Sequence, residues 1–181
     1  KTDEERSRVM AATAGITQLL AGVRVRVDDR DEYRPGRKFN EWELKGVPVR
    51  IELGPRDLDA GQVTIARRDT AQKSQSPLDT LDSVVPALLE AIQENLYRQA
   101  ESFRDEHTFR PKDYAEMARL LEDPGGFMVA GWCGEETCEQ KVKAETKATI
   151  RYLPLEPAAP DGPCIVCGSP AVDEAAWAQA Y

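Results

Sequence analysis

Four cysteines in two closely spaced pairs constrain this 181-residue chain more than any other feature. Four residues separate Cys133 from Cys138, two separate Cys164 from Cys167, and twenty-five lie between the pairs. Two such pairs, brought together by a loop, supply the four thiolates of a tetrahedral zinc site. We therefore predict a structural Zn²⁺ that leaves no coordination position for a catalytic water. Four unrelated buried thiols, or disulfides, are the alternative.

The setting expected for these cysteines is the reducing cytoplasm. The chain contains no apolar run of about 18 residues, the length that would predict a membrane span. Its first residues, KTDEER, lack the apolar segment of a signal peptide. In a reducing compartment, cysteines bind metal more often than they form disulfides.

The acidic charge is distributed unevenly along the chain. The net charge is −8, yet residues 24–73 hold twelve basic and ten acidic side chains, and the remainder holds twelve basic and twenty-two acidic ones. Whole-chain attraction to phosphate is therefore weak, which argues against tight nonspecific binding of nucleic acid. The distribution leaves room for a few placed contacts within 24–73.

In the first half of the chain, helical and strand patterns alternate. Residues 2–20 predict a helix that opens with a capping box of Thr2 and Glu5. Alternating apolar residues predict strands at 23–27, at 47–53 and from Val63. Residues 28–42 predict a loop because they are polar and contain Pro35-Gly36. A long amphipathic helix is expected from Pro86 to about 106.

The second half predicts a smaller unit. We expect a helix from about 111 to 123, a strand over 127–132, a helix over 136–146 and a strand over 149–153. The fold class is therefore an α/β domain, with a mixed sheet and flanking helices, over 1–106, followed by a small α+β zinc-binding domain over 107–181. His107, the only histidine, is expected to be a solvated residue at a helix end. No nucleophile pair or phosphate-binding loop is apparent, so we expect no catalytic centre in this chain.

Several motifs resemble the archaeal/eukaryote-like group of prolyl-tRNA synthetases, over essentially the whole chain. The longest is RPGRKFNEWELKGVPVRIELGPRDL, at 34–58. It is followed in order by ENLYRQAESFRDE at 94–106, WCG at 132–134, KATIR at 147–151, CIVCG at 164–168 and AQAY at 178–181. The resemblance implies a tRNA anticodon-binding domain, whose first strand would precede Lys1, and a C-terminal zinc-binding domain.

The resemblance also implies residues that read the anticodon. A proline anticodon carries two consecutive guanines, whose edges arginine and carboxylate groups can read. Glu43 and Arg50 stand at positions similar to the family's guanine-reading pair, and Lys73 lies near its third contact, where Arg68 competes. On strand parity alone, Arg50 and Glu52 could instead be a solvated face.

Neighbouring residues have alternative interpretations. Phe39 and Trp42, with Lys38, could form a stacking and phosphate platform, or the two rings could belong to the core. Glu41 and Lys45 are expected to be solvated. Arg56 and Asp57 are expected to be a structural turn pair.

The resemblance implies partners beyond this chain. A catalytic domain that binds ATP, Mg²⁺ and proline would precede Lys1, and the full-length enzyme would be a homodimer acting on tRNA(Pro). The terminal carboxylate of Tyr181 would reach toward that catalytic site, unless it is a free end. A free-standing zinc-bearing module that binds RNA or protein, and a scaffold for a dimer, are the two alternative functions.

Overall fold

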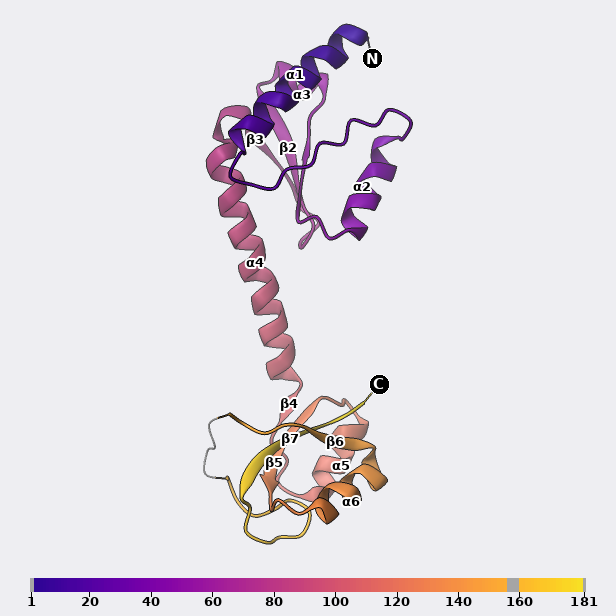
Figure 1. Ribbon diagram of the computed structural model, residues 1–181, viewed down its shortest axis with the longest axis vertical. Coiled ribbons are helices and arrows are strands. Elements are labelled where there is room, and N and C mark those ends of the chain that lie inside the picture. The colour runs from indigo at the N-terminus through magenta and orange to yellow at the C-terminus, as the bar shows by residue number, and fades with distance from the viewer. Residues whose placement is uncertain (1, 156–159, 181) are drawn as a thin grey trace. The chain divides into compact units, whose positions relative to one another are not determined.

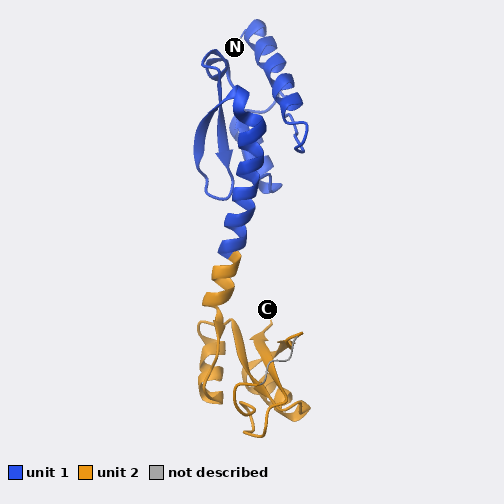
Figure 2. Ribbon diagram, turned by 90° about the vertical axis from the view of Figure 1, so that its left-hand side faces the viewer, with its two compact units in different colours: residues 1–99 blue, residues 100–181 orange. Residues whose placement is uncertain are grey.

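The computed structural model describes residues 2–155 and 160–180. It divides into two compact units, residues 1–99 and 100–181 (Figures 1 and 2). The division falls inside one long helix, α4 (Leu81–Glu106). The boundary expected at 106/107 stays a prediction. Each unit has a hydrophobic core of its own, so each is described separately.

Helix α1 (Asp3–Leu19) opens unit 1 as the sequence predicts. The Glu5 N–H donates to the Thr2 hydroxyl at 3.2 Å, and the Thr2 N–H donates to the Glu5 carboxylate at 3.0 Å, which is the expected capping box. The helix carries Leu20, at its C-terminal end, into the core of this unit.

Two expectations for residues 23–42 are wrong. Residues 23–27 are not a strand of the described sheet: residues 24–27 form no backbone hydrogen bond within the described ranges. Alternating valines favour an extended backbone, but a strand also needs a neighbour to pair with. The expected loop contains helix α2 (Pro35–Leu44), because Pro35 occupies its first turn, where a missing N–H costs nothing.

A three-stranded antiparallel sheet forms the centre of unit 1. Its order is β1 (Val49–Glu52), β2 (Gln62–Arg67), β3 (Lys73–Pro77). The first two confirm the predicted strands. The polar β3 was not predicted, and a short helix, α3 (Pro55–Asp59), joins β1 to β2. One face of the sheet carries apolar residues to the core, which consists of Leu20, Val63, Ile65, Leu81 and Val85.

Helix α4 begins five residues earlier than predicted. A short 3₁₀ turn (Leu78–Thr80) leads into it, and Pro86 lies inside the helix. Proline removes one hydrogen bond at this point, to the carbonyl of Asp82, but the buried Leu81 and Val85 hold the preceding turn against the sheet. None of the described helices is long and apolar enough to cross a membrane.

Unit 2 follows the predicted α+β pattern closely. Its elements are β4 (Thr108–Phe109), α5 (Tyr114–Glu122), β5 (Phe127–Trp132), α6 (Glu136–Thr146), β6 (Ala148–Tyr152) and β7 (Asp173–Gln179). The sheet order is β4-β5-β7-β6, with β4 parallel to β5 and the other pairs antiparallel. The last strand, which was not predicted, lies inside the sheet.

The core of unit 2 lies between this sheet and helices α5 and α6. Trp177 on β7 is fully buried, as are Met117, Met128 and Val142. Helix α5 begins at the cap residue Asp113, whose carboxylate accepts from the Glu116 N–H at 2.8 Å. It therefore starts a few residues later than the sequence suggested.

Candidate nucleic-acid interface and metal centre

The sheet of unit 1 presents a charged face opposite its core face. In the strand register, Arg50 on β1 pairs with Ala66 on β2, and Ala66 pairs with Lys73 on β3. Residues paired across a sheet point to the same side, so the two cations flank a small alanine. Because Ala66 has only a methyl group, the long side chains on either side have room above it.

The Arg50 guanidinium is held by groups from α2. Its Nη1 atom donates to Glu43 Oε1 at 2.6 Å, and its Cζ atom lies 4.1 Å from the centre of the Phe39 ring. Glu43 is in the last turn of α2, and Phe39 is one turn earlier on the same helix. A cation held over an aromatic face and against a carboxylate is restricted in its orientation.

Glu52 joins Arg50 to Lys73, a link that the sequence analysis missed. Its Oε1 atom accepts from Arg50 Nε at 3.0 Å and from Lys73 Nζ at 2.9 Å. Burial opposes ionisation of this carboxyl, but the hydrogen bonds from Lys73 and Arg50 outweigh it, so its pKa lies below the ordinary value. The three predicted anticodon residues therefore belong to one hydrogen-bonded network. The alternation of side chains along a strand could have indicated this link, because it places Glu52 on the same face of β1 as Arg50.

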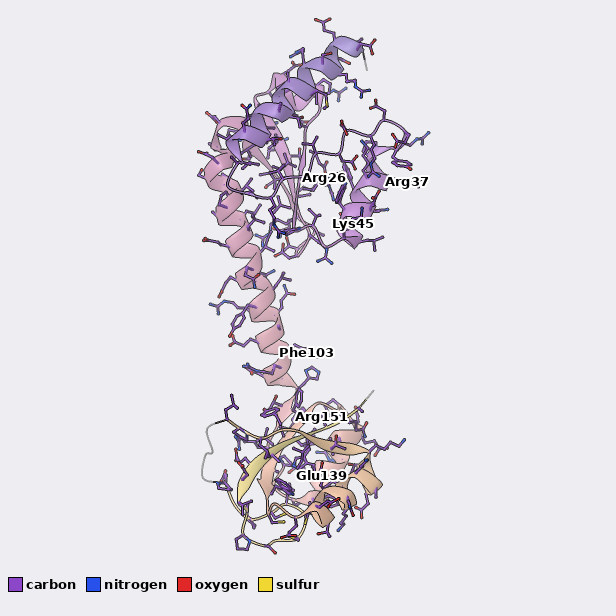
Figure 3. The ribbon with its side chains drawn as sticks, viewed as in Figure 1. Arg26, Arg37, Lys45, Phe103, Glu139 and Arg151 are labelled. Atoms are coloured by element: carbon purple, nitrogen blue, oxygen red, sulfur yellow. The ribbon has the colours of Figure 1, made fainter. Side chains whose placement is uncertain are left out.

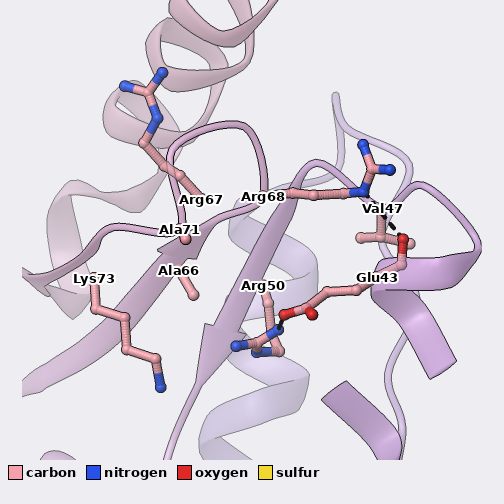
Figure 4. A pocket seen from close by; sticks show the side chains of 8 residues that line it. All are labelled: Glu43, Val47, Arg50, Ala66, Arg67, Arg68, Ala71 and Lys73. Atoms are coloured by element: carbon pink, nitrogen blue, oxygen red, sulfur yellow. Dashed lines mark hydrogen bonds and ion pairs between the residues drawn. The ribbon is translucent and has the colours of Figure 1, made fainter. Parts of the chain in front are cut away.

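These side chains surround a pocket of about 210 Å³ (Figure 4). Arg50 and Arg68 both contact Glu43, Arg50 at its carboxylate and Arg68 at its backbone carbonyl, and Arg67 points away from them. Arg67 is instead tied to Asp69 by two bonds, of 3.0 and 2.6 Å. The pocket can offer hydrogen-bond donors and one exposed carboxylate to a planar polar ligand. It is lined by Glu43, Val47, Arg50, Ala66, Arg67, Arg68, Ala71 and Lys73.

The two aromatic residues of α2 have different roles. Phe39 is half-buried beneath Arg50 and lies outside the hydrophobic core cluster. The Trp42 indole N–H donates to Asp28 Oδ2 at 2.8 Å, and Lys38 Nζ donates to the Asp28 backbone carbonyl at 3.2 Å. Trp42 and Lys38 therefore anchor the extended segment before α2, whereas Phe39 belongs to the charged face.

The remaining predictions near this face have mixed outcomes. Glu41 was expected to be simply solvated, but it pairs with Lys45 at 2.7 Å and with Arg30 at 2.9 Å. Asp57 accepts from the Gly54 N–H at 2.9 Å at the start of α3, so its structural role is confirmed, whereas the expected role of Arg56 stays a prediction. Figure 3 labels Arg26, on the extended segment, and Arg37 and Lys45, at the two ends of α2.

The four cysteines of unit 2 come together as the spacing predicts. All four Sγ atoms lie within 4.8 Å of one another; Cys133 and Cys138 are 3.6 Å apart, and Cys133 and Cys167 are 3.7 Å apart. Four sulfurs bound to one Zn²⁺ would be ~3.8 Å apart. The distances are far longer than a disulfide bond, and all four cysteines are free. The cluster can hold a metal.

Local backbone features bring the two pairs together. Cys138 occupies the first turn of α6, and Gly168 closes a turn through its N–H bond to the Cys164 carbonyl at 2.9 Å. Gly168 has φ +74°, a conformation that favours glycine. At Gly131 on β5, an added Cβ would lie 2.8 Å from the Pro163 carbonyl oxygen. This glycine therefore allows the second cysteine loop to approach the strand.

Two further predictions concern residues outside these sites. His107 is half-buried at the end of α4, where its ring stacks on Phe103 and its Nδ1 lies 2.7 Å from the Phe103 carbonyl oxygen. It was expected to be solvated and is instead packed against its own helix. Tyr181 lies outside the described residues.

Comparison with known proteins identifies the family. A model of the anticodon binding domain matches residues 5–88, and a model of the C-terminal part of prolyl-tRNA synthetase matches residues 114–181. The chain belongs to the prolyl-tRNA synthetase family. A proline–tRNA ligase from Alkaliphilus oremlandii is 48% identical over 158 residues, which are 87% of this chain and 33% of that protein.

Other family members agree over nearly the full chain. A proline–tRNA ligase from Symbiobacterium thermophilum is 46% identical, over 97% of this chain and 38% of its own length. The prolyl-tRNA synthetase of Giardia lamblia, solved with prolyl-adenylate, has a TM-score of 0.87 and 30% identity, over 99% of this chain and 39% of its own. This chain thus spans well under half of each of these prolyl-tRNA synthetases.

Proposed function

We propose that this chain is the anticodon-reading and zinc-binding part of a proline–tRNA ligase, which activates proline with ATP and transfers it to tRNA(Pro). The observation that carries the proposal is the network of Glu43, Arg50 and Lys73 on the charged face of unit 1. The match to an anticodon-binding domain over the same residues supports it. ATP and Mg²⁺ would bind in the part of the longer ligases that this chain does not match.

The chemistry of the network suits guanine. An arginine donates two hydrogen bonds to guanine O6 and N7, and a carboxylate accepts from guanine N1–H and the N2 amino group. Arg50 and Glu43 offer these groups 2.6 Å apart, and Lys73 adds a third donor. Adenine has an amino group in place of O6 and no N1–H, so it would leave both groups poorly paired.

Preorganisation supports the same assignment. Arg50 is held by Glu43, Glu52 and the Phe39 ring before any ligand arrives. A binding site whose side chains are already ordered loses less conformational entropy when a base enters. Solvated surface arginines would not be held from three sides.

For unit 2 we propose that the four cysteines bind Zn²⁺ as a structural ion. Thiolates are preferred zinc ligands, and the sulfur separations fit a tetrahedron around that ion. Since the ion would join the loop after β5, helix α6 and the 164–168 turn, its binding free energy would stabilise the folding of this unit.

We also propose that one more strand completes the sheet of unit 1. A groove of about 1330 Å³ lies between the extended residues 23–29 and the open edge of β1, and apolar side chains line it, among them Val25, Val27 and Ile51. Both borders offer backbone groups without a strand partner in the described ranges. A strand between them would satisfy both edges. The longer ligases have residues that this chain does not match, and such residues could supply it.

The same proposal includes the partners of this chain in the longer protein. The chain would work in the cytoplasm beside its own catalytic domain, in a homodimer. Its task would be to hold tRNA(Pro) by the anticodon so that the 3′ end reaches the activated proline.

Binding to short RNA hairpins that carry the tRNA(Pro) anticodon loop tests the anticodon assignment. Glu43→Ala and Arg50→Ala should each weaken binding by about 1–3 kcal/mol, whereas the exposed controls Glu90→Ala and Arg56→Ala should not. Equal losses for hairpins of unrelated sequence would indicate a general RNA- or protein-binding module. No binding to any hairpin would indicate a scaffold.

A further inference from the structure

Within the described residues, one cation that lines the pocket of unit 1 lacks an acidic partner. Arg50 pairs with Glu43 and Glu52, and Lys73 pairs with Glu52. A third cation of the pocket, Arg67, is tied to Asp69. For Arg68, no carboxylate among the described residues lies within ion-pair distance.

Arg68 is nevertheless held in place. Its backbone N–H donates to the Pro48 carbonyl at 2.9 Å, and its side-chain Nε donates to the Glu43 carbonyl at 3.0 Å. The first bond holds the backbone of Arg68, and the second holds the Nε atom of its side chain. The terminal Nη1 and Nη2 groups have no partner in the described part of the chain. They extend past Val47, away from the Arg50 guanidinium (Figure 4).

The free end of Arg68 matches an anionic group with several oxygens. A guanidinium presents parallel N–H donors that fit a phosphate, and an exposed arginine gains most from a ligand that carries charge. Glu43 contacts Arg50 through its carboxylate and Arg68 through its backbone carbonyl. The Arg68 guanidinium therefore lies about one residue's length from the pair that is proposed to read the base. Each nucleotide read at the pair brings a phosphate with it.

We propose that Arg68 binds a backbone phosphate of the nucleotides whose bases Glu43 and Arg50 read. The inference rests on the proposed function, since it assumes that RNA enters this pocket. Arg68 then sets the position of the loop and contributes affinity, while Arg50 and Glu43 discriminate the bases.

The competing explanation is purely structural. Glu43 lies in the last turn of α2, where carbonyl groups lack partners in the helix, and an arginine often caps such a carbonyl. A cap would affect the stability of unit 1 but would not affect the salt dependence of RNA binding.

The test measures how Kd for the anticodon-loop hairpin depends on salt, for the chain and for Arg68→Gln. One phosphate contact to single-stranded RNA contributes a slope of about 0.7 in log Kd against log salt. The slope should fall by about that amount, with binding ~fivefold weaker at 0.1 M salt. Arg68→Lys, which keeps the charge, should retain the slope. Arg56→Gln is the matched control, because Arg56 is also exposed but does not line the pocket.

The outcomes separate this inference from the proposed function. If the unmodified chain prefers the guanine-containing loop, but Arg68→Gln changes neither slope nor affinity, Arg68 is only a helix cap. If Arg68→Gln abolishes the preference for guanine, as Arg50→Ala should, Arg68 reads a base and the phosphate assignment is wrong. If the unmodified chain shows no preference for guanine, the proposed function fails whatever Arg68 does.

Discussion

The carboxylate of Asp69 is expected to fix the hairpin that carries Arg68 and Lys73. Its side chain is only 2% exposed; it accepts two bonds from Arg67, and its Oδ2 atom accepts from Asn95 Nδ2 on α4 at 2.7 Å. The hydrogen bond from Arg67 lowers the pKa of this carboxyl from 3.8 to about 2. A lower pKa in the folded state means that the ionised form stabilises unit 1.

The size of the effect follows from the hydrogen bonds that this carboxylate accepts. Hydrogen bonds to a charged group contribute about 1.5–3 kcal/mol, so loss of the ionised acceptor is expected to cost about 2 kcal/mol at neutral pH. Because the folded pKa is depressed, this contribution is fully present above the unfolded value near 4 and is lost as pH falls toward 2. Asp69→Asn should therefore destabilise unit 1 by about 2 kcal/mol at pH 7, and by much less at about pH 2.

Urea unfolding of unit 1, followed by hydrogen exchange in a peptide that covers β2, measures this difference at both pH values. The control is Asp59→Asn, whose carboxylate is 62% exposed and pairs only with Arg8 among the described residues. It should change stability by less than about 0.5 kcal/mol. A loss for Asp69→Asn that is as large at pH 2 as at pH 7 would refute the reasoning.

Two further predictions concern the rest of the chain. Chelation of metal, or the substitution Cys164→Ser, should unfold unit 2 and expose the buried Trp177, which a change in tryptophan fluorescence would report. Strand β2 of unit 1 should keep its protection from hydrogen exchange. An unchanged Trp177 environment would show that the cysteines need no ion. Restoring the proposed strand, in a longer proline–tRNA ligase chain that contains these residues, should slow amide exchange at Val25 and Val27. Exchange at the rate of the shorter chain would count against a completing strand.

The second half of the fold could be predicted closely because its signals are local. The helix over 136–146 and the strand over 127–132 have the predicted bounds. The cysteine spacing also predicted the cluster, since the short spacing within each pair needs only one tight turn. Strand β7 was missed because its sequence, DEAAWAQ, buries small alanines on both faces and shows no apolar alternation.

The first half was harder because pairing is not local. Residues 23–27 carry a strand pattern, yet no described strand lies beside them. Strand β3 is polar, and it was missed because only its pairing with β2 makes it a strand. The sequence could suggest Glu43, Arg50 and Lys73 by resemblance, but the roles of Glu52 and Phe39 depend on the register of β1 and the position of α2.

The most direct test of guanine reading is a double-mutant cycle between the protein and the RNA. Kd is measured for the chain and for Arg50→Ala, each with the native anticodon loop and with a loop in which both guanines are adenines. The account predicts that the base change costs the unmodified chain at least about 1–3 kcal/mol and costs Arg50→Ala clearly less. An equal cost for both proteins, or no cost for either, would contradict it.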